Sequence, residues 1–391
     1  MHPPKPAPAR WRSVCRTAHR WIALVSMVLL VPIALSGSLL VWHDALDALI
    51  NPGRYAGSDH GATQPTSLYL ARAAEALPAG ITAVALRYPD EPGDPLTVTA
   101  RGAPREDGPA SFRRVYLDPP TARVLDVVDP RMSFVGFLHR FHENLTVPGL
   151  FGRQMVGWMG VAMFALALTG IWLWWPRNAA FVVGLRWRRA PATTSNLHYV
   201  VGFWISIPLA LVSLTGVYLA FPHTARSVTS SFAPMSPVPP RGGAGSEAMP
   251  QIALDADAVL AKALEETHAD AHGTRPAAIF VPRGGGARDE TARRAAPQWR
   301  VVLRDATGGT MTVLVDDATG AVRRAGDPLA GDRVAQWMRW IHEGSHSGPV
   351  WPCVVFLAGL ALPALAVTGL VMWLRGRRIR RSAVLAPGAA A

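Results

Sequence analysis

The sequence predicts a membrane protein of the α+β class, with four transmembrane helices and two small α+β modules arranged as a tandem duplication. Three observations support this prediction. Four stretches of at least 22 residues carry no charged side chain, the two long connections contain strand-like runs, and four histidines recur at matched positions. A run of about 20 apolar residues is long enough to cross a bilayer as a helix.

The uncharged stretches locate the four predicted membrane helices at residues 21–42, 154–175, 197–222 and 349–374. The first is too long for a cleaved signal peptide, and cleavage would remove His19. With its flanking segments, the chain divides into an N-terminal segment (1–20), the first helix (21–43), a first module (44–130), a histidine-bearing interfacial segment with the second helix (131–176), a basic loop (177–196), the third helix (197–222), a linker with the second module (223–330), a second histidine-bearing segment with the fourth helix (331–375) and a tail (376–391).

Charge placement predicts the orientation. Segments 1–20, 176–196 and 375–381 hold five, four and five Lys/Arg residues and no acid, which accounts for the formal net charge of +12. Short loops rich in Lys and Arg stay in the cytoplasm. We therefore expect both termini and the 176–196 loop in the cytoplasm, and the connections 43–153 and 223–348 in the periplasm. The charge is a topology signal, so it does not predict a nucleic-acid partner.

Each long connection predicts a small folded module. Residues 67–78 have helical apolar spacing and are followed by strand-like runs at 81–89, 95–100 and 113–127. The second connection repeats this order, with a helical run at 255–268 and then PAAIFVP, QWRVVLRD and MTVLVDDATGAVRRAG. We expect one helix on a few antiparallel strands in each module. The Pro/Gly/Ser-rich stretch 223–251 predicts a flexible linker, and 284–296 predicts a mobile hairpin tip.

Four histidines form two matched pairs. Two of them precede a Ser/Thr-Gly step by 18 residues, and the other two precede a Thr-Gly step by 28 and 27 residues. The matches are His19 with Gly37, His198 with Gly216, His142 with Gly170, and His342 with Gly369. An ionisable residue at a membrane helix indicates function by default. Repeated pairs are typical of the axial ligands of haem iron.

The spacing places one pair at each membrane face. Eighteen residues of helix span roughly 27 Å, close to the hydrocarbon thickness. We term His19 and His198 the inner pair, and His142 and His342 the outer pair. A haem on the inner pair would meet the glycines of the second and fourth helices, and a haem on the outer pair those of the first and third. Small residues let a flat macrocycle lie against a helix, so the pattern predicts two stacked haems.

Other interpretations of these histidines stay open. All four could be interfacial anchors, because Trp and Tyr residues crowd the same places. At the outer pair, His139 and His346 share helical faces with His142 and His342, and are alternate ligands, supporting groups or contacts to a metal substrate. A divalent metal site built from the four outer histidines with Glu143 or Glu343 is a rival to the haem interpretation.

Nearby residues carry weaker signals. Arginines beside the outer pair could hold haem propionates or could be snorkelling anchors; they are Arg140, Arg153, Arg333 and Arg339. His43 beside Asp44 is interpreted as an interfacial residue. Cys15 and Cys353 fall on opposite sides of the membrane, so no disulfide is expected, and without a CxxCH motif any haem would be of the non-covalent b type.

The chain resembles the PepSY-associated transmembrane proteins of bacteria. The strings that carry the resemblance are HRWIALVSMVLLVPIALSGSLLVW, FHENLTVPGLFGRQMVGWMGVAMFALALTGIWLWWPR, NLHYVVGFWISIPLALVSLTGVYLAFP and ALAVTGLVMWLRGRR, and they extend over nearly the whole length. The family includes inner-membrane di-haem b reductases of ferric siderophores, similar to the ferrioxamine reductase. The resemblance therefore implies two PepSY modules, two haem b groups and iron-chelate reduction.

The expected function is electron transfer from the inner to the outer pair and reduction of a ferric siderophore or other iron chelate outside. No dinucleotide fingerprint is visible, because GGAGSEA (242–248) and RGGGARD (283–289) lack the strand–helix context. The donor is then a membrane quinol or a cytoplasmic flavoprotein. The alternative is a PepSY binding or regulatory module that its helices anchor in the membrane lipid, without redox activity. Transport of the chelate is disfavoured, because the helices contain no buried charges.

Overall fold

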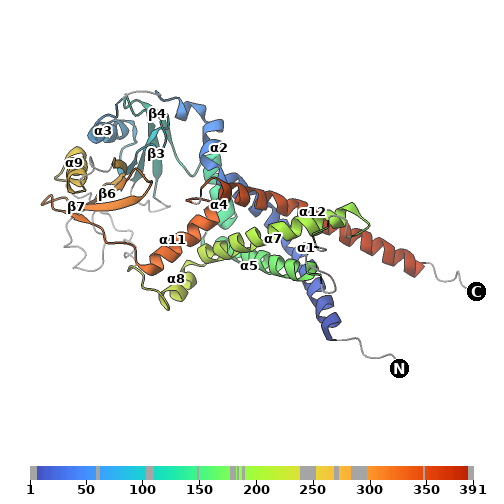
Figure 1. Cartoon of the computed structure of the whole chain (residues 1–391). Helices are drawn as coiled ribbons and strands as arrows, with labels where there is room; N and C mark the ends of the chain where they lie inside the picture. The colour runs from blue at the N-terminus through green and yellow to red at the C-terminus, as the bar shows by residue number, and fades with distance from the viewer. Residues whose placement is uncertain are drawn as a thin grey trace, which may run out of the picture. The chain divides into compact units, whose positions relative to one another are not determined.

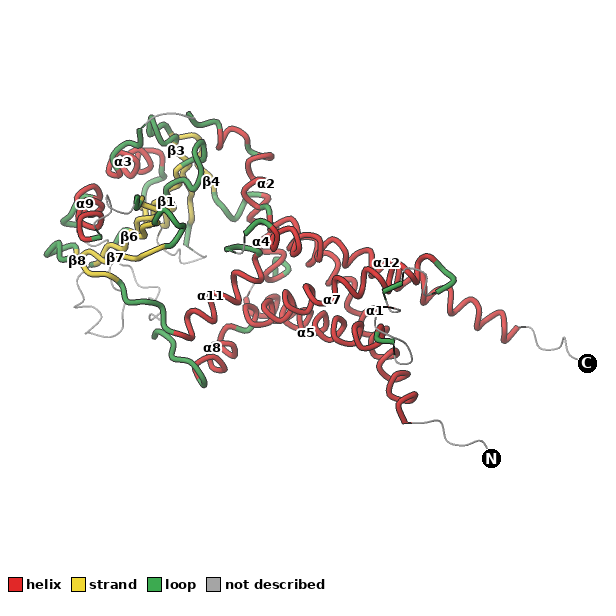
Figure 2. The backbone as a smooth tube through the Cα atoms, in the orientation of Figure 1, coloured by secondary structure: helices red, strands yellow, loops and turns green. Residues whose placement is uncertain are grey.

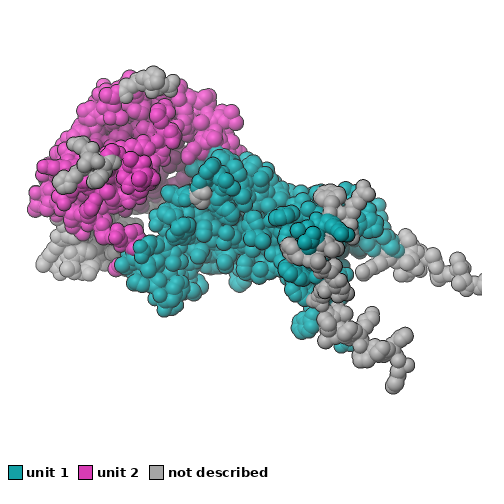
Figure 3. Space-filling view, in the orientation of Figure 1, with its two compact units in different colours: residues 1–43, 137–236, 329–391 teal, residues 44–136, 237–328 magenta. Residues whose placement is uncertain are grey.

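The computed structural model describes residues 7–58, 62–102, 110–147, 149–176, 182, 185–186, 190–237, 252–267, 273–282, 297–346 and 348–385. The chain divides into two compact units, which Figure 3 shows in different colours. The membrane unit comprises residues 1–43, 137–236 and 329–391, and the sheet unit comprises residues 44–136 and 237–328. Each unit therefore takes segments from both halves of the duplication.

The membrane unit is helical (Figure 1). Within the described residues, four helices are long and apolar enough to cross a membrane, which confirms the predicted number. They are α1 (Ala7–Val41), α5 (Gly149–Trp174), α7 (Thr193–Ala220) and α12 (Val350–Leu385). Three shorter helices accompany them: α4 (Phe134–Asn144), α8 (Pro222–Ser230) and α11 (Ala330–Glu343).

The four long helices pack as a ring in which equivalent helices of the two halves are diagonal. α1 packs against α5 and α12, and α7 packs against the same two helices. Their shared core contains Leu30 and Leu209, each 11 residues after the inner histidine of its own helix, with Met163 and Leu362 from α5 and α12. The middle of the bundle is therefore apolar and repeats the duplication.

Helix ends differ from the expected boundaries. α1 begins at Ala7 and α7 at Thr193, so His19 and His198 lie inside their helices rather than at the first turn. α8 occupies the start of the predicted linker, where Pro222 takes an early helical position that suits its missing N–H. The rest of that linker (238–251) and the predicted hairpin tip (284–296) lie outside the described residues.

In the sheet unit, the eight described strands form one antiparallel sheet in the order β4-β3-β2-β1-β5-β6-β7-β8 (Figure 2). The strands are β1 (Ile81–Arg87), β2 (Leu96–Gly102), β3 (Phe112–Leu117), β4 (Val124–Val128), β5 (Arg275–Phe280), β6 (Gln298–Arg304), β7 (Thr310–Asp316) and β8 (Val322–Arg324). The two expected modules are thus fused edge to edge through β1 and β5, with Leu86 opposite Ile279. This pairing covers one edge of each module.

One helix from each half covers the same face of the sheet. α3 (Thr66–Ala76) packs on β1 to β4, and α9 (Ala256–Glu266) packs on β6, β7 and β8. Every second residue of a strand points toward these helices. Val98 and Val301 are examples, and both are fully buried. The short segments α2 (His43–Ile50) and η1 (Pro52–Tyr55) precede the first module.

The turns that end β3 and β7 show the duplication at atomic detail. The N–H of Asp118 donates to the carbonyl of Arg123, and the N–H of Asp316 donates to that of Ala321, both at 2.9 Å. The fifth residue of each turn has a positive φ, 54° at Ala122 and 69° at Gly320. Glycine adopts this conformation without strain, so the second half carries the better turn residue.

Asp257 of α9 joins the two halves at the start of α3. Its carboxylate accepts the backbone N–H of Thr66 at 2.5 Å and a hydrogen bond from the Ser67 hydroxyl. The residue before α3 is Pro65, which makes no side-chain cap. A carboxylate at a helix N-terminus satisfies unpaired N–H groups and complements the helix dipole. The cap of α3 therefore comes from the other module.

We predict that Asp257→Ala loosens the junction, because α3 loses its N-terminal acceptor at a cost of about 1–2 kcal/mol. Hydrogen–deuterium exchange of the purified chain should show faster exchange in the first turn of α3. Glu265→Ala, an exposed change on α9, is the matched control and should leave that exchange unchanged. Equal exchange in both variants would contradict the capping role.

Candidate functional site

The outer pair lies where two short helices meet the long ones. His142 is on α4 and its ring contacts Gly37 of α1, while His342 is on α11 and its ring contacts Gly216 of α7. A Cβ atom built on Gly37 would lie 2.6 Å from Cε1 of His142, and one built on Gly216 would lie 2.8 Å from Cε1 of His342. These two glycines make room for the imidazoles.

Hydrogen bonds orient both rings of the outer pair in the same way. Nδ1–H of His142 donates to the carbonyl of Ile33 at 2.9 Å, and Nδ1–H of His342 donates to the carbonyl of Val212 at 2.9 Å. A carbonyl only accepts, so each Nδ1 carries the proton and each Nε2 keeps a lone pair. Metal-ligating histidines donate their second ring N–H to an acceptor in the same manner.

The rings of His142 and His342 are neighbours. Their centroids are 6.0 Å apart and the ring planes are tilted by 41°. Two imidazoles bonded on opposite sides of one metal ion, at about 2.0–2.1 Å each, have centroids about 6 Å apart. The separation of the rings is therefore compatible with two histidines that share one metal ion.

The surroundings keep the outer pair neutral. Removal from water lowers the pKa of His142 to about 4, and the neighbouring His342 acts in the same direction. Removal from water also lowers the pKa of His342. Both imidazoles are therefore neutral at pH 7, and the neutral ring is the form that binds a metal.

The inner pair uses threonine in place of the backbone carbonyl. Nδ1 of His19 lies 2.8 Å from Oγ1 of Thr169 on α5, and Nδ1 of His198 lies 3.0 Å from Oγ1 of Thr368 on α12. The hydroxyl of Thr169 donates to the carbonyl of Ala165 at 2.6 Å, and that of Thr368 is bonded in the same way. Each hydroxyl oxygen is then an acceptor, so these imidazoles also donate through Nδ1–H.

Each predicted glycine lies beside a histidine of the predicted site. Gly170 is next to His19 and Gly369 is next to His198, with hypothetical Cβ atoms at 3.6 and 3.4 Å from Cε1. The structure therefore brings each histidine to the Ser/Thr-Gly step of another helix. The contact with haem that was predicted for these glycines stays a prediction. The Ser and Thr residues before each glycine were visible in the sequence, but their role as histidine partners was missed.

The alternate ligands have other neighbours. The ring of His139 lies edge-on to that of His43 at 5.8 Å, and the ring of His346 stacks on Trp340 at 4.4 Å. No group of three or more His, Cys, Asp or Glu side chains comes together as a metal site in the described part of the chain. The rival divalent site that includes Glu143 or Glu343 gains no support from this arrangement.

Two of the arginines considered as propionate partners already have acceptors. Arg153 donates to the carbonyl of Leu219 at 2.7 Å, and Arg339 pairs with Glu343 at 3.1 Å. The propionate role of Arg140 and Arg333 stays a prediction.

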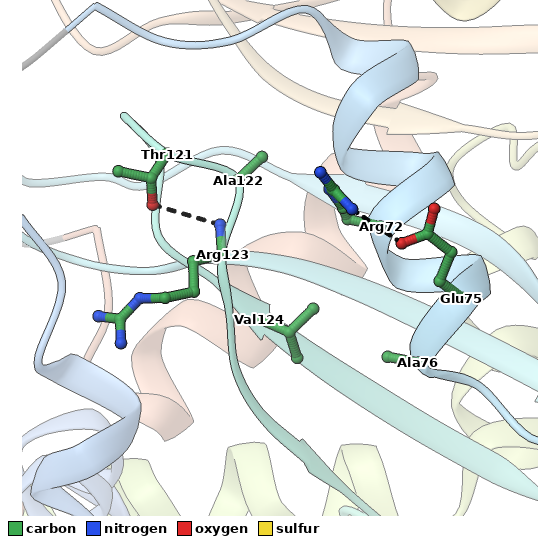
Figure 4. Close-up of a pocket in the computed structure, with 7 residues that line it drawn as sticks. All are labelled: Arg72, Glu75, Ala76, Thr121, Ala122, Arg123 and Val124. Carbon is green, nitrogen blue, oxygen red and sulfur yellow. Dashed lines mark hydrogen bonds and ion pairs between the residues drawn. The ribbon is translucent and has the colours of Figure 1, made fainter.

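A hollow of about 430 Å³ in the sheet unit is a different kind of feature (Figure 4). It lies between α3 and the turn that follows β3, and Arg72 on its rim pairs with Glu75 at 3.0 Å. Both side chains are exposed and neutralise each other, so we assign the hollow no function.

The fold and the histidine pairs define a membrane protein with two pairs of imidazoles in a bundle of four long helices. The chain belongs to the family described as PepSY-associated TM region, which matches residues 16–376 and confirms the expected family. No curated protein matches the chain.

Three of the four glycines give a graded prediction. In Gly37→Ala and Gly216→Ala the new methyl group collides with an imidazole, and we expect a loss of about 1–3 kcal/mol. In Gly170→Ala the methyl group makes an ordinary contact, and Ala favours the helix by up to about 1 kcal/mol, so stability should hold or rise. Thermal unfolding of the purified variants measures this. Equal losses at all positions would contradict the close imidazole contact.

Proposed function

We propose that the chain is a bacterial inner-membrane di-haem b electron-transfer protein that reduces ferric siderophore-type complexes on the periplasmic side. The observation that carries the proposal is the outer pair. The ring centroids of His142 and His342 are 6.0 Å apart, and each ring donates its Nδ1–H to a helix carbonyl. Histidines that hold a metal donate their second ring N–H in this way, so His142 and His342 would hold the iron of a haem between them.

The chain's own residues would hold one haem at each membrane face. His19 and His198 would hold the inner group, and His142 and His342 would hold the outer group. Haem, when bound, supplies reversible one-electron redox chemistry. The apolar core around Leu30, Leu209 and Met163 keeps water out of the bundle between the two pairs.

The orientation is part of the proposal. Acid-free basic segments flank the inner pair along the chain, and such segments stay in the cytoplasm. The sheet unit is then periplasmic. One electron converts Fe(III) to the less charged Fe(II), which oxygen-rich chelators hold less tightly. The glycine-rich strings 242–248 and 283–289 have no dinucleotide-binding context in the sequence, and both lie outside the described residues. The proposal therefore includes a separate electron donor, a quinol or a cytoplasmic flavoprotein.

The alternative function is a membrane-anchored binding or regulatory module without redox activity. The sheet of eight described strands supports it, because a sheet of this size offers a large surface for a partner. The two functions differ in haem content, so the first measurement below separates them.

We predict about two b haems per chain. Pyridine haemochrome analysis of protein from haem-replete cells should show the loss of one haem in His19→Ala and of one in His142→Ala, because each variant lacks one of two axial ligands. His223→Ala, an exposed histidine on α8, is the matched control and should keep the full load. Full haem content in both ligand variants would contradict the ligand assignment. A colourless wild-type protein would favour the anchored module.

We further predict that the two pairs act at opposite ends of the path. His342→Ala should abolish reduction of an external ferric chelate and leave the inner haem reducible by the physiological donor. His198→Ala should block electron entry, so that the outer haem stays oxidised with that donor but is reduced by dithionite. Haem reduction and Fe(II) release are followed optically in membranes. Unchanged ferric reduction in His342→Ala would remove the outer pair from the mechanism.

A further inference from the structure

The first turns of α1 carry three arginines beside the inner pair. Arg12, Arg16 and Arg20 are spaced by four residues, so they are neighbours along one side of the helix. His19 shares this side with Arg12, because the seven residues between them make almost two full turns. The same seven residues place Arg12 about 10 Å from His19 along the helix axis.

Two hydrogen bonds show that this side of α1 lies along the last turn of α5. Nδ1 of His19 is 2.8 Å from Oγ1 of Thr169, and Nη2 of Arg12 donates to the carbonyl of Leu173 at 2.8 Å. α5 ends at Trp174, and the last carbonyls of a helix have no partner within it. The contact with Leu173 therefore holds the guanidinium of Arg12 in place beside the inner pair.

Arg12 and Arg20 each keep a buried donor without an acceptor. Nε of both side chains is shielded from water, and neither atom has a hydrogen-bond partner among the described residues. A guanidinium stays charged and has five N–H donors, so the bond from Arg12 to Leu173 occupies only one of them. A buried donor of a charged group is costly unless an acceptor is present. Arg16, between the two, is exposed and has no such requirement.

The duplication indicates that these arginines serve something other than the packing of the bundle. In the second half, the position that matches Arg12 is Pro191, and the position that matches Arg20 is Tyr199. A role in packing would be expected in both halves, because the helices and the histidines repeat. An acceptor that occurs once per inner pair needs cationic partners from one half only. Haem has this asymmetry, since both of its propionates leave one edge of the macrocycle.

We propose that Arg12 and Arg20 bind the propionate carboxylates of the inner haem through their buried Nε–H groups. The inference rests on the proposed function for the presence of haem at His19 and His198, and it adds two binding residues to that site. A guanidinium binds a carboxylate through charge-assisted hydrogen bonds, which are stronger than those between neutral groups. The phosphate of a lipid headgroup offers the same anionic oxygens, and the experiment separates the two sources.

The charge of these arginines should raise the midpoint potential of the inner haem. A guanidinium beside a propionate neutralises the carboxylate that would otherwise act on the iron. Ferric haem carries one positive charge more than ferrous haem, so an uncompensated carboxylate favours the ferric form. Removal of the arginine therefore lowers the midpoint potential. Exposed Arg16 acts on the iron through water and salt, which screen its charge.

The test uses the full chain loaded with haem and purified in a neutral detergent that contains no phosphate. Redox titration followed by absorption gives the midpoint potential of the inner haem, which is identified by its loss in His19→Ala. We expect Arg12→Gln to lower this potential by about 59 mV, a tenfold change in the ratio of ferrous to ferric haem. Arg20→Gln should act in the same direction, and Arg12→Lys should restore part of the loss. The matched control Arg16→Gln removes the same charge and should leave the potential unchanged.

Resonance Raman spectra of the same samples give a second measurement, because the propionate bending modes respond to hydrogen bonding. These modes should shift in Arg12→Gln and Arg20→Gln and stay in place in Arg16→Gln. Loss of the inner haem in Arg12→Gln together with its retention in Arg12→Lys would also support the proposal.

Three results would overturn it. The first is an unchanged potential and unchanged propionate modes in both Arg12→Gln and Arg20→Gln with full haem content. The second is an equal fall of the potential in Arg16→Gln, which would identify a general effect of charge. The third is a response that appears only after anionic phospholipid is added, which would identify a lipid headgroup as the acceptor. A wild-type protein without haem would refute the proposed function itself, whereas haem that is insensitive to both arginines would refute this inference alone.

Discussion

The histidine Nδ1–H bond to an oxygen of a neighbouring membrane helix is the interaction on which the candidate site depends. His142 and His342 use the carbonyls of Ile33 and Val212, and His19 and His198 use threonine hydroxyls that already donate to their own helices. In a medium without water, an imidazole needs such a partner. The bond also settles the tautomer, because the proton on Nδ1 leaves Nε2 as the free base. One hydrogen bond therefore holds the ring in place, offsets the desolvation of Nδ1 and leaves Nε2 with the lone pair that binds a metal.

The duplication explains why this contact occurs four times. Each histidine reaches the Ser/Thr-Gly step of a different helix, so every contact is also a link between elements. At the outer pair the glycines are essential for the fit, since a methyl group would lie within 2.6–2.8 Å of a ring carbon. At the inner pair the same step leaves ordinary contact distances, and threonine provides the specific bond. The apolar core between the pairs follows the same repeat, with Leu30 matching Leu209.

Most of the membrane unit could be predicted from the sequence, whereas less of the sheet unit could. The four long helices, the duplication and the histidine–glycine matches could be predicted because each is a local pattern with a fixed spacing. The acceptors of the outer pair could not, because any backbone carbonyl looks the same in sequence. The fusion of the modules through Leu86 and Ile279 was missed for a related reason. The two strands that pair at this junction, β1 and β5, are nearly 200 residues apart in the sequence. Neither run of residues indicates which strand it pairs with. The sequence predicts a linker where the structure has α8. The polar composition of this segment hides the helix, which begins at Pro222.

The central proposal is that His142 and His342, each with a lone pair on Nε2, would together hold one haem iron. Electron paramagnetic resonance of the oxidised, purified protein tests this claim most directly, because two imidazole ligands make ferric haem low-spin. The account predicts low-spin ferric signals that account for all the haem, with the Thr169→Val and Thr368→Val variants altering the signal of the inner haem alone. A dominant high-spin signal in the wild-type protein, or no haem signal at all, would contradict it.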